Sequence, residues 1–300
     1  MSLETAYRMA DTKGNYRQRF GSYNTKVIVS GSTLEVYELT TKQRRGYENA
    51  NAGTKKRSFS ELSVHEQIES VKRKQKNLKQ KRIDVMRVIS TNFRQGLTKF
   101  VTLTFRDHVT DRAFAMNEFK KFMKRLNKRQ KDKGRETVQY LGVIEYTKQG
   151  RIHFHVVLFN CAYIPKSELE TVWENGFVQI NQIHGMNGSA VARYVTKYMA
   201  KQFQNMEEDL AEWLRLGQET EKQKDYFTSR NLKKPAYRYL NVENGKAPDL
   251  VNGADLVKTS EYQRKLYLGD GPDGTPLFKV ETVRYKMYEL PSNFREKNIA

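Results

Sequence analysis

The segment Ile152-His-Phe-His-Val-Val-Leu-Phe159 says most about the architecture, because its β-branched, aromatic and aliphatic residues predict a buried strand. The preceding segment Val138–Tyr146 has the same character, and Thr147-Lys148-Gln149-Gly150 between the two predicts a tight turn. These two strands therefore form a predicted antiparallel hairpin. A third buried strand is predicted upstream, at Phe100-Val-Thr-Leu-Thr-Phe105, where apolar and β-branched residues again run together.

Helices are predicted between and after these strands. Asp111–Gln130 has an apolar stripe and a basic opposite face, which is typical of an amphipathic helix. A short helix at Lys166–Trp173 and a short strand at Phe177–Ile180 follow, and Ser189 is expected to cap a further helix over Ala190–Gln202. Because strands and helices do not alternate regularly, the sequence predicts an α+β fold with a central antiparallel sheet flanked by helices.

The chain before these strands is polar and basic. Residues 1–57 are rich in Gly, Ser, Thr, Asn and basic residues, so we expect them to be loosely structured apart from a short apolar run at Lys26–Ser30. A helix is predicted near residues 60–90, capped by Ser60, because apolar residues recur there at helical spacing. The run Lys72–Arg82 holds basic residues and no acidic one, and either bound phosphates or solvent must offset their repulsion.

The chain after residue 205 changes character again. An acidic amphipathic stretch, Glu207–Gln218, precedes a basic, tyrosine-rich tail in which Asp270-Gly271-Pro272-Asp273-Gly274 predicts a late β-hairpin. These changes predict three parts, namely a basic N-terminal extension over residues 1–95, a core over residues 96–205, and a helical segment with a basic hairpin region over residues 206–300.

The overall charge indicates a polyanionic partner. The chain has 54 Lys and Arg against 34 Asp and Glu, a net charge of +20, which makes nucleic acid the first candidate. No apolar run is long enough to span a membrane and no signal peptide is evident, so a cytoplasmic location is expected. The single cysteine, Cys161, excludes an intrachain disulfide and a cysteine-built metal site. Any metal site must therefore use histidines and carboxylates.

Two histidines in the central predicted strand are candidate metal ligands. Side chains alternate faces along a strand, so His153 and His155 share one face, roughly 7 Å apart. Glu145 lies near the same level of the preceding strand and would complete a set of two imidazoles and one carboxylate. Such a set suits Mg²⁺ or Mn²⁺. The alternative is that both histidines are hydrogen-bonded to neighbouring polar groups.

A second candidate group lies on the helix predicted over Ala190–Gln202. Tyr194, Lys197, Tyr198 and Lys201 are spaced by three and four residues, so they share one helical face. Two hydroxyl groups and two ammonium groups thus form a patch. The alternative is an ordinary exposed stripe of polar residues on the helix surface.

Taken together, these segments resemble a known family. Phe100-Val-Thr-Leu-Thr-Phe105, His153-Phe-His155 with its upstream Glu145, and Tyr194-Val-Thr-Lys-Tyr-Met-Ala-Lys201 are similar to the three ordered motifs of HUH endonucleases. The resemblance is to rolling-circle replication initiators (Rep) of small phages and plasmids, in particular the two-tyrosine type of phage gene A proteins. It covers residues 97–205. A Gly-x-x-x-x-Gly-Lys-Ser/Thr loop is not evident, which implies that a host helicase unwinds the DNA.

The resemblance implies a reaction and a division of labour. A palm-like sheet would hold a divalent metal on the two histidines and the glutamate. Tyr198 would attack a phosphodiester of single-stranded origin DNA, giving a 5′-phosphotyrosine and a free 3′-hydroxyl that a DNA polymerase extends. Tyr194 would act at a second cleavage, after which the strand is rejoined, and Lys197 and Lys201 would support the tyrosines. The expected setting is the cytoplasm of a bacterial host.

Basic residues supply the predicted contacts to DNA phosphates. They are Lys120, Lys124, Arg125, Lys128, Arg193, Arg230, Lys233 and Lys234. Two alternatives stay open at this point. A noncatalytic DNA-binding regulator would explain the charge, although it leaves the histidines and tyrosines without a role. A transposase or a conjugative relaxase would use the same nuclease chemistry on a different DNA substrate.

Overall fold

The protein folds as two units in the computed structural model. The structure describes residues 21–45, 58–147, 149–181, 183, 188–204, 226–242, 254–270 and 275–291. One unit comprises residues 55–234, and the other combines residues 1–54 with residues 235–300. These units are spatial, and the division of the chain at residues 95 and 205 stays a prediction.

The 55–234 unit is built on a five-stranded antiparallel sheet, in the order β6-β3-β5-β4-β7. Its strands are β3 Lys99–Phe105, β4 Gln139–Tyr146, β5 Ile152–Phe159, β6 Gly176–Asn181 and β7 Tyr226–Thr228. The predicted hairpin is present, because β4 and β5 pair along their whole length, from Gln139 opposite Phe159 to Tyr146 opposite Ile152. Gly150 in the connecting turn has a φ of +80°, a conformation that favours glycine.

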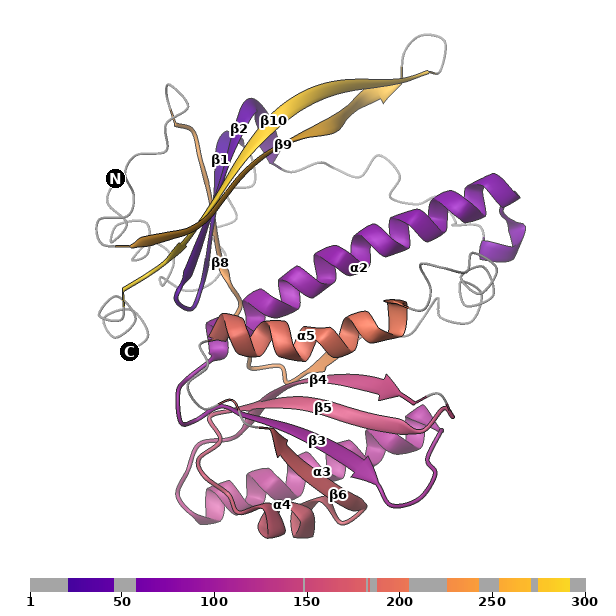
Figure 1. The fold of residues 1–300 in the computed structure, drawn as a ribbon, viewed down its shortest axis with the longest axis vertical. Coiled ribbons are helices and arrows are strands. Elements are labelled where there is room, and N and C mark those ends of the chain that lie inside the picture. Colours follow the sequence, from indigo (N-terminus) through magenta and orange to yellow (C-terminus); the bar gives the residue numbers. More distant parts are fainter. Residues whose placement is uncertain are drawn as a thin grey trace. The chain divides into compact units, whose positions relative to one another are not determined.

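Helices cover both faces of this sheet (Figure 1). On one face lie α2 Val64–Asn92 and α5 Gly188–Gln204, and on the other lie α3 Arg112–Asp132 and α4 Lys166–Trp173. The α+β class with an antiparallel sheet flanked by helices is therefore confirmed.

Side-chain alternation in β5 gives the two faces different cores. Phe154 and its even-numbered neighbours pack with α3 and α4 in a large cluster that includes Phe119 and the fully buried Trp173. Val157 and Phe159 point to the other face and pack with α2 and α5 in a smaller cluster. The odd-numbered His153 and His155 therefore belong to the α2 and α5 face, beyond the edge of its apolar cluster.

Two helix starts differ from the sequence-based expectation. Ser60 lies in the short 3-10 helix η1, Phe59–Glu61, and α2 is capped instead by Ser63, whose side chain accepts a hydrogen bond from Glu66 N. Ser63 and Glu66 form a reciprocal capping box, which outcompetes the earlier serine. Likewise α5 begins at Gly188, so Ser189 lies inside its first turn and does not precede the helix.

The second unit is a separate five-stranded antiparallel sheet in the order β8-β1-β2-β10-β9. Its strands are β1 Gly21–Ser30, β2 Thr33–Arg45, β8 Ala236–Leu240, β9 Asp255–Asp270 and β10 Pro276–Glu289. The late hairpin is confirmed by the pairing of β9 with β10, while its turn residues 271–274 and the stretch Glu207–Gln218 lie outside the described residues.

The expectation that residues 1–57 are loosely structured was wrong for the part that is described. β1 is longer than the predicted apolar run and pairs with β2 through a two-residue turn containing Gly31, whose φ is +61°. β1 also pairs with β8, and β2 with β10, from the far end of the chain. Polar strands of this kind are stabilised by distant partners that local sequence does not reveal.

Candidate functional site

A buried histidine lies at the centre of the α2 and α5 face. His155 is 4 % exposed, its Nε2 lies 2.5 Å from Glu145 Oε2, and its Nδ1 lies 3.1 Å from Thr102 Oγ1. Because both ring nitrogens have a polar partner, the orientation of the imidazole is fixed by β3 on one side and β4 on the other.

The hydrogen bonds continue from Thr102 to the edge of the sheet. Asn181 Nδ2 donates to Thr102 Oγ1 at 3.2 Å and to the Phe100 carbonyl oxygen at 3.5 Å, so its amide group is oriented by two acceptors. The Thr102 hydroxyl can then donate to His155 Nδ1, which leaves the Nε2 proton directed at Glu145. We call Asn181, Thr102, His155 and Glu145 the polar row. It crosses four adjacent strands, β6, β3, β5 and β4.

His153 lies beside the polar row. In the strand register it is directly opposite Glu145 in β4 and Thr104 in β3, on the same face as His155, and it is half-buried. The structure therefore brings Glu145, His153 and His155 together on one face, as the strand alternation predicted.

The donor set of two imidazoles and a carboxylate fits a divalent cation in kind. In the structure, Glu145 and His155 are hydrogen-bonded to each other, so a cation would have to take the place of the proton between Oε2 and Nε2. Within the residues described, no group of three or more His, Cys, Asp or Glu side chains is arranged closely enough to hold a metal ion. Mg²⁺ or Mn²⁺ binding here thus stays a proposal.

Helix α5 carries Tyr194 to the same face. The Tyr194 ring, 37 % exposed, packs edge-on against Phe100 with ring centroids 5.4 Å apart, and the Phe100 ring is 6.2 Å from that of His155. One aromatic ring therefore separates Tyr194 from the polar row. Val191 and Val195 are fully buried and hold this part of α5 against the sheet.

The other members of the predicted patch follow along α5. Lys197 is exposed, and the α5 backbone places Tyr198 one turn after Tyr194 and Lys201 one turn after Lys197. The side chains of Tyr198 and Lys201 lie outside the described part of the structure.

Contacts with α2 fix where α5 begins and how it lies. A Cβ added at Gly188 would come 3.0 Å from Phe93 Cβ and 3.2 Å from Ser90 Cα, so the two helices approach closely there. Further along, Arg82 Nε donates to Oγ1 of the buried Thr196 at 3.4 Å. The position of the tyrosine helix therefore depends on α2.

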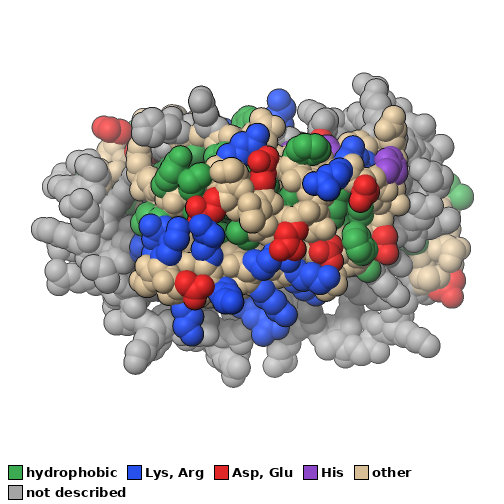
Figure 2. Space-filling model, turned by 90° about the horizontal axis from the view of Figure 1, so that it is seen from below, with side chains coloured by type: hydrophobic (Ala, Val, Ile, Leu, Met, Phe, Trp, Pro, Cys, Tyr) green, Lys and Arg blue, Asp and Glu red, His purple; other side chains and the backbone are tan. Residues whose placement is uncertain are grey.

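The predicted DNA contacts on α3 lie on the opposite face from His155. Lys120, Lys124 and Lys128 are exposed there, and Figure 2 shows Lys and Arg side chains on this side interspersed with Asp and Glu. Arg125 has structural partners, because it donates to the carbonyl oxygens of Val172 and Trp173 at the end of α4 and forms an ion pair with Glu174.

Other predicted contacts lie elsewhere in the same unit. Arg193 is exposed on α5, and Arg230, Lys233 and Lys234 are exposed after β7. The backbone at Lys233 is held by Asn92, whose side chain both accepts from Lys233 N at 2.9 Å and donates to Lys233 O at 2.8 Å. These four basic residues are thus attached to the elements that border the α2 and α5 face.

Sequence reasoning did not identify Thr102 and Asn181. The available signal was the alternation in Phe100-Val-Thr-Leu-Thr-Phe105, which puts two threonines on one face of a strand whose other residues are apolar. The contribution of Asn181 depends on β6 pairing with β3, a contact between segments far apart in the sequence.

Comparisons with known proteins agree with this geometry. Residues 98–203, about a third of the chain, match a family model described as replication-associated protein of the ORF2 type. The matched region begins at the start of β3 and ends within α5, so it contains the polar row and the tyrosine helix. This match supports a rolling-circle replication initiator. Neither a search of curated proteins nor a search of solved structures gave a match.

The family match also implies DNA binding. Among the residues that the structure describes, no helix is long and apolar enough to cross a membrane.

Proposed function

We propose that the protein is a rolling-circle replication initiator that nicks single-stranded origin DNA and later rejoins it, using the tyrosines of α5 and a metal held by Glu145, His153 and His155. The observation that carries the proposal is the contact of Tyr194 with Phe100, which brings α5 against the same sheet face as the polar row. The match of residues 98–203 to a replication-associated family supports it independently.

In the proposed reaction Tyr198 is the first nucleophile. Its oxygen bonds to the phosphorus of the scissile phosphodiester while the bond from phosphorus to the 3′-oxygen breaks. The phenol proton is lost to solvent and the leaving oxygen gains one, so the products are a 5′-phosphotyrosine and a 3′-hydroxyl. A bound divalent cation supplies positive charge that polarises the phosphate and stabilises the charge developing on its oxygens.

The chain's own residues would orient the reactants. Thr102 fixes the ring plane of His155 from the side opposite Glu145, and the buried residues Val191 and Val195 hold α5 against the sheet. Tyr194 would attack in the second cleavage, and the phosphotyrosine formed first would be released when the strand is rejoined. Lys197, exposed on α5, can pair with a DNA phosphate.

The test is covalent capture. Purified protein is incubated with Mg²⁺ or Mn²⁺ and labelled single-stranded DNA tiled across its own replicon, and products are resolved on a denaturing gel. We expect a protein–DNA adduct with the DNA joined through its 5′ end. The adduct should be lost in the Y194F/Y198F double variant and in the presence of EDTA.

A matched control separates chemistry from folding. Tyr163→Phe changes an exposed tyrosine on another loop and should leave adduct formation intact. DNA binding without adduct under every metal would identify a noncatalytic regulator. Adduct formation only on transposon ends or a transfer origin would identify a transposase or relaxase.

A further inference from the structure

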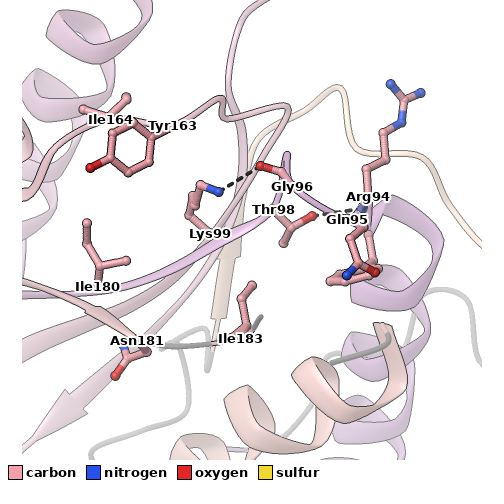
Figure 3. Close-up of a pocket in the computed structure, with 11 residues that line it drawn as sticks. Arg94, Gln95, Gly96, Thr98, Lys99, Tyr163, Ile164, Ile180, Asn181 and Ile183 are labelled. Atoms are coloured by element: carbon pink, nitrogen blue, oxygen red, sulfur yellow. Dashed lines mark hydrogen bonds between the residues drawn. The ribbon is translucent and has the colours of Figure 1, made fainter. Parts of the chain in front are cut away.

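A pocket opens at the edge of the sheet, next to the outer end of the polar row. Its volume is about 220 Å³, and it lies where β3 begins and β6 ends, bordered by the loop after α2 and the loop after β5. Figure 3 shows Tyr163 and Ile164 on one side, Ile180 and Asn181 below them, and the loop from Arg94 to Thr98 on the other side. We call it the edge pocket.

The walls combine an aromatic ring, apolar surface and positive charge. Tyr163 is 76 % exposed, which is high for a tyrosine side chain. Ile164, Ile180 and Ile183 give apolar contact area, and Arg94 and Lys99 bring positive charge to the rim. A volume below the ~300–1,000 Å³ of typical small-molecule sites suits one flat ring system better than a larger ligand.

The loop that carries the positive charge is held in place. Lys99 Nζ donates to the Gly96 carbonyl oxygen at 2.8 Å, and Arg94 N donates to Oγ1 of the buried Thr98 at 2.9 Å. Gly96 has a φ of +77°, which favours glycine. An ammonium group has three donors, so Lys99 can keep the Gly96 contact while it binds a phosphate oxygen.

Asn181 connects the pocket to the candidate active site. It lines the edge pocket and also donates to Thr102, which contacts His155. β6 and β5 are separated by one strand, so Asn181 and His155 lie about 10 Å apart across the sheet at the usual strand spacing. A single DNA strand with a phosphate near His155 can therefore extend a neighbouring base to the edge pocket.

We propose that the edge pocket binds one base of the single DNA strand that lies on the polar row, with the base stacked on Tyr163 and its flanking phosphate near Lys99. This inference rests on the proposed function, because it takes single-stranded DNA as the substrate. An exposed aromatic ring beside cations is the arrangement with which proteins bind unpaired bases. The net charge of +20 is complementary to such a strand.

The test measures binding alone, so it does not depend on cleavage. Fluorescence anisotropy with labelled single-stranded homopolymers of dT, dA and dC, in EDTA, is compared for the wild type, Y163A and Y163F. Loss of one stacked base should weaken binding of at least one homopolymer about 5- to 150-fold in Y163A. Y163F keeps the ring and should bind within about 2-fold of the wild type.

Two further measurements assign the effect to a base. Y163A should leave the salt dependence of binding unchanged, while K99Q should lower the slope by about 0.7, the value for one phosphate contact to a single strand. Replacing one nucleotide at a time with an abasic one should reveal a position that weakens wild-type binding and leaves Y163A binding unchanged. Tyr262→Ala removes an exposed tyrosine of the other unit and should have no such effect.

The outcomes separate the two proposals. Equal affinities of Y163A and wild type for all three homopolymers, with no abasic position that couples to Tyr163, would overturn the edge pocket while leaving the nuclease proposal intact. Weaker DNA binding by Y163A in a protein that forms no adduct would support the pocket and reject the nuclease.

Discussion

The two faces of the sheet in the 55–234 unit are made by alternate residues of the same strands, yet they serve different purposes. On the α3 and α4 face, Phe154 is fully buried in a continuous apolar cluster with Phe119 and Trp173. On the α2 and α5 face, the next residue, His155, is equally buried but lies in a row of hydrogen-bonded polar side chains. The difference suggests that one face supplies most of the stability, which allows the other to carry polar groups.

The largest expected effect comes from replacing the adjacent residues Phe154 and His155. Phe154→Ala leaves a cavity in the larger core and should lower the free energy of unfolding by about 3–5 kcal/mol. His155→Ala removes the partner of Glu145 and Thr102 and should cost about 1–3 kcal/mol. Urea titrations measure both.

Adduct formation should respond in the opposite order. His155→Ala should abolish the adduct at temperatures where the variant is folded, and Phe154→Leu, which keeps an apolar side chain, should retain it. Equal stability losses in the two alanine variants would contradict the proposed division between the faces.

A smaller effect is expected at Thr102, which touches His155 and has no place in the chemistry itself. Thr102→Val keeps the shape and removes the hydroxyl, so Mn²⁺ affinity measured by calorimetry should fall about 10- to 100-fold, as for other partners of metal ligands. Thr102→Ser restores the hydroxyl and should recover most of the affinity. Nitrogen NMR of His155 should show a changed tautomer population in the valine variant only.

Helix caps on the two faces should differ by less. Asp111 caps α3 by accepting hydrogen bonds from Ala113 N and Phe114 N, and Asp111→Ala should cost about 1 kcal/mol because α3 packs on the larger core. Ser63 caps the end of α2 that is far from its core residues Val85 and Ile89. Ser63→Ala should therefore change global stability by less than about 0.5 kcal/mol. Equal losses would show that α2 unfolds only together with the sheet.

The smallest expected response is that of Cys161 to alkylation. Burial in the larger core raises the pKa of this thiol to about 11, so the thiolate is scarce in the folded protein below that pH. Iodoacetamide at pH 8 should modify it far more slowly than in urea-unfolded protein. Rapid native modification, followed by mass spectrometry, would show that the α3 and α4 core opens readily.

Local sequence pattern predicted most of the 55–234 unit because its strands and helices have strong periodicity of their own. β5 and α4 were predicted with the bounds that the structure has, and the shared face of His153 and His155 follows from strand alternation. Asn181 joins the polar row only through the pairing of β6 with β3, so sequence alone did not reveal it. The β1 and β2 hairpin was missed for a related reason, since it pairs with strands from the other end of the chain.

The most direct test of the account is to locate the covalent link. Trypsin cuts after Arg193, Lys197 and Lys201, so it places Tyr194 and Tyr198 in different peptides, and mass spectrometry of the digested adduct can assign the nucleotide to one of them. The account predicts that the nucleotide from the first cleavage is attached to Tyr198. A nucleotide attached outside α5, or no adduct with any divalent metal, would contradict it.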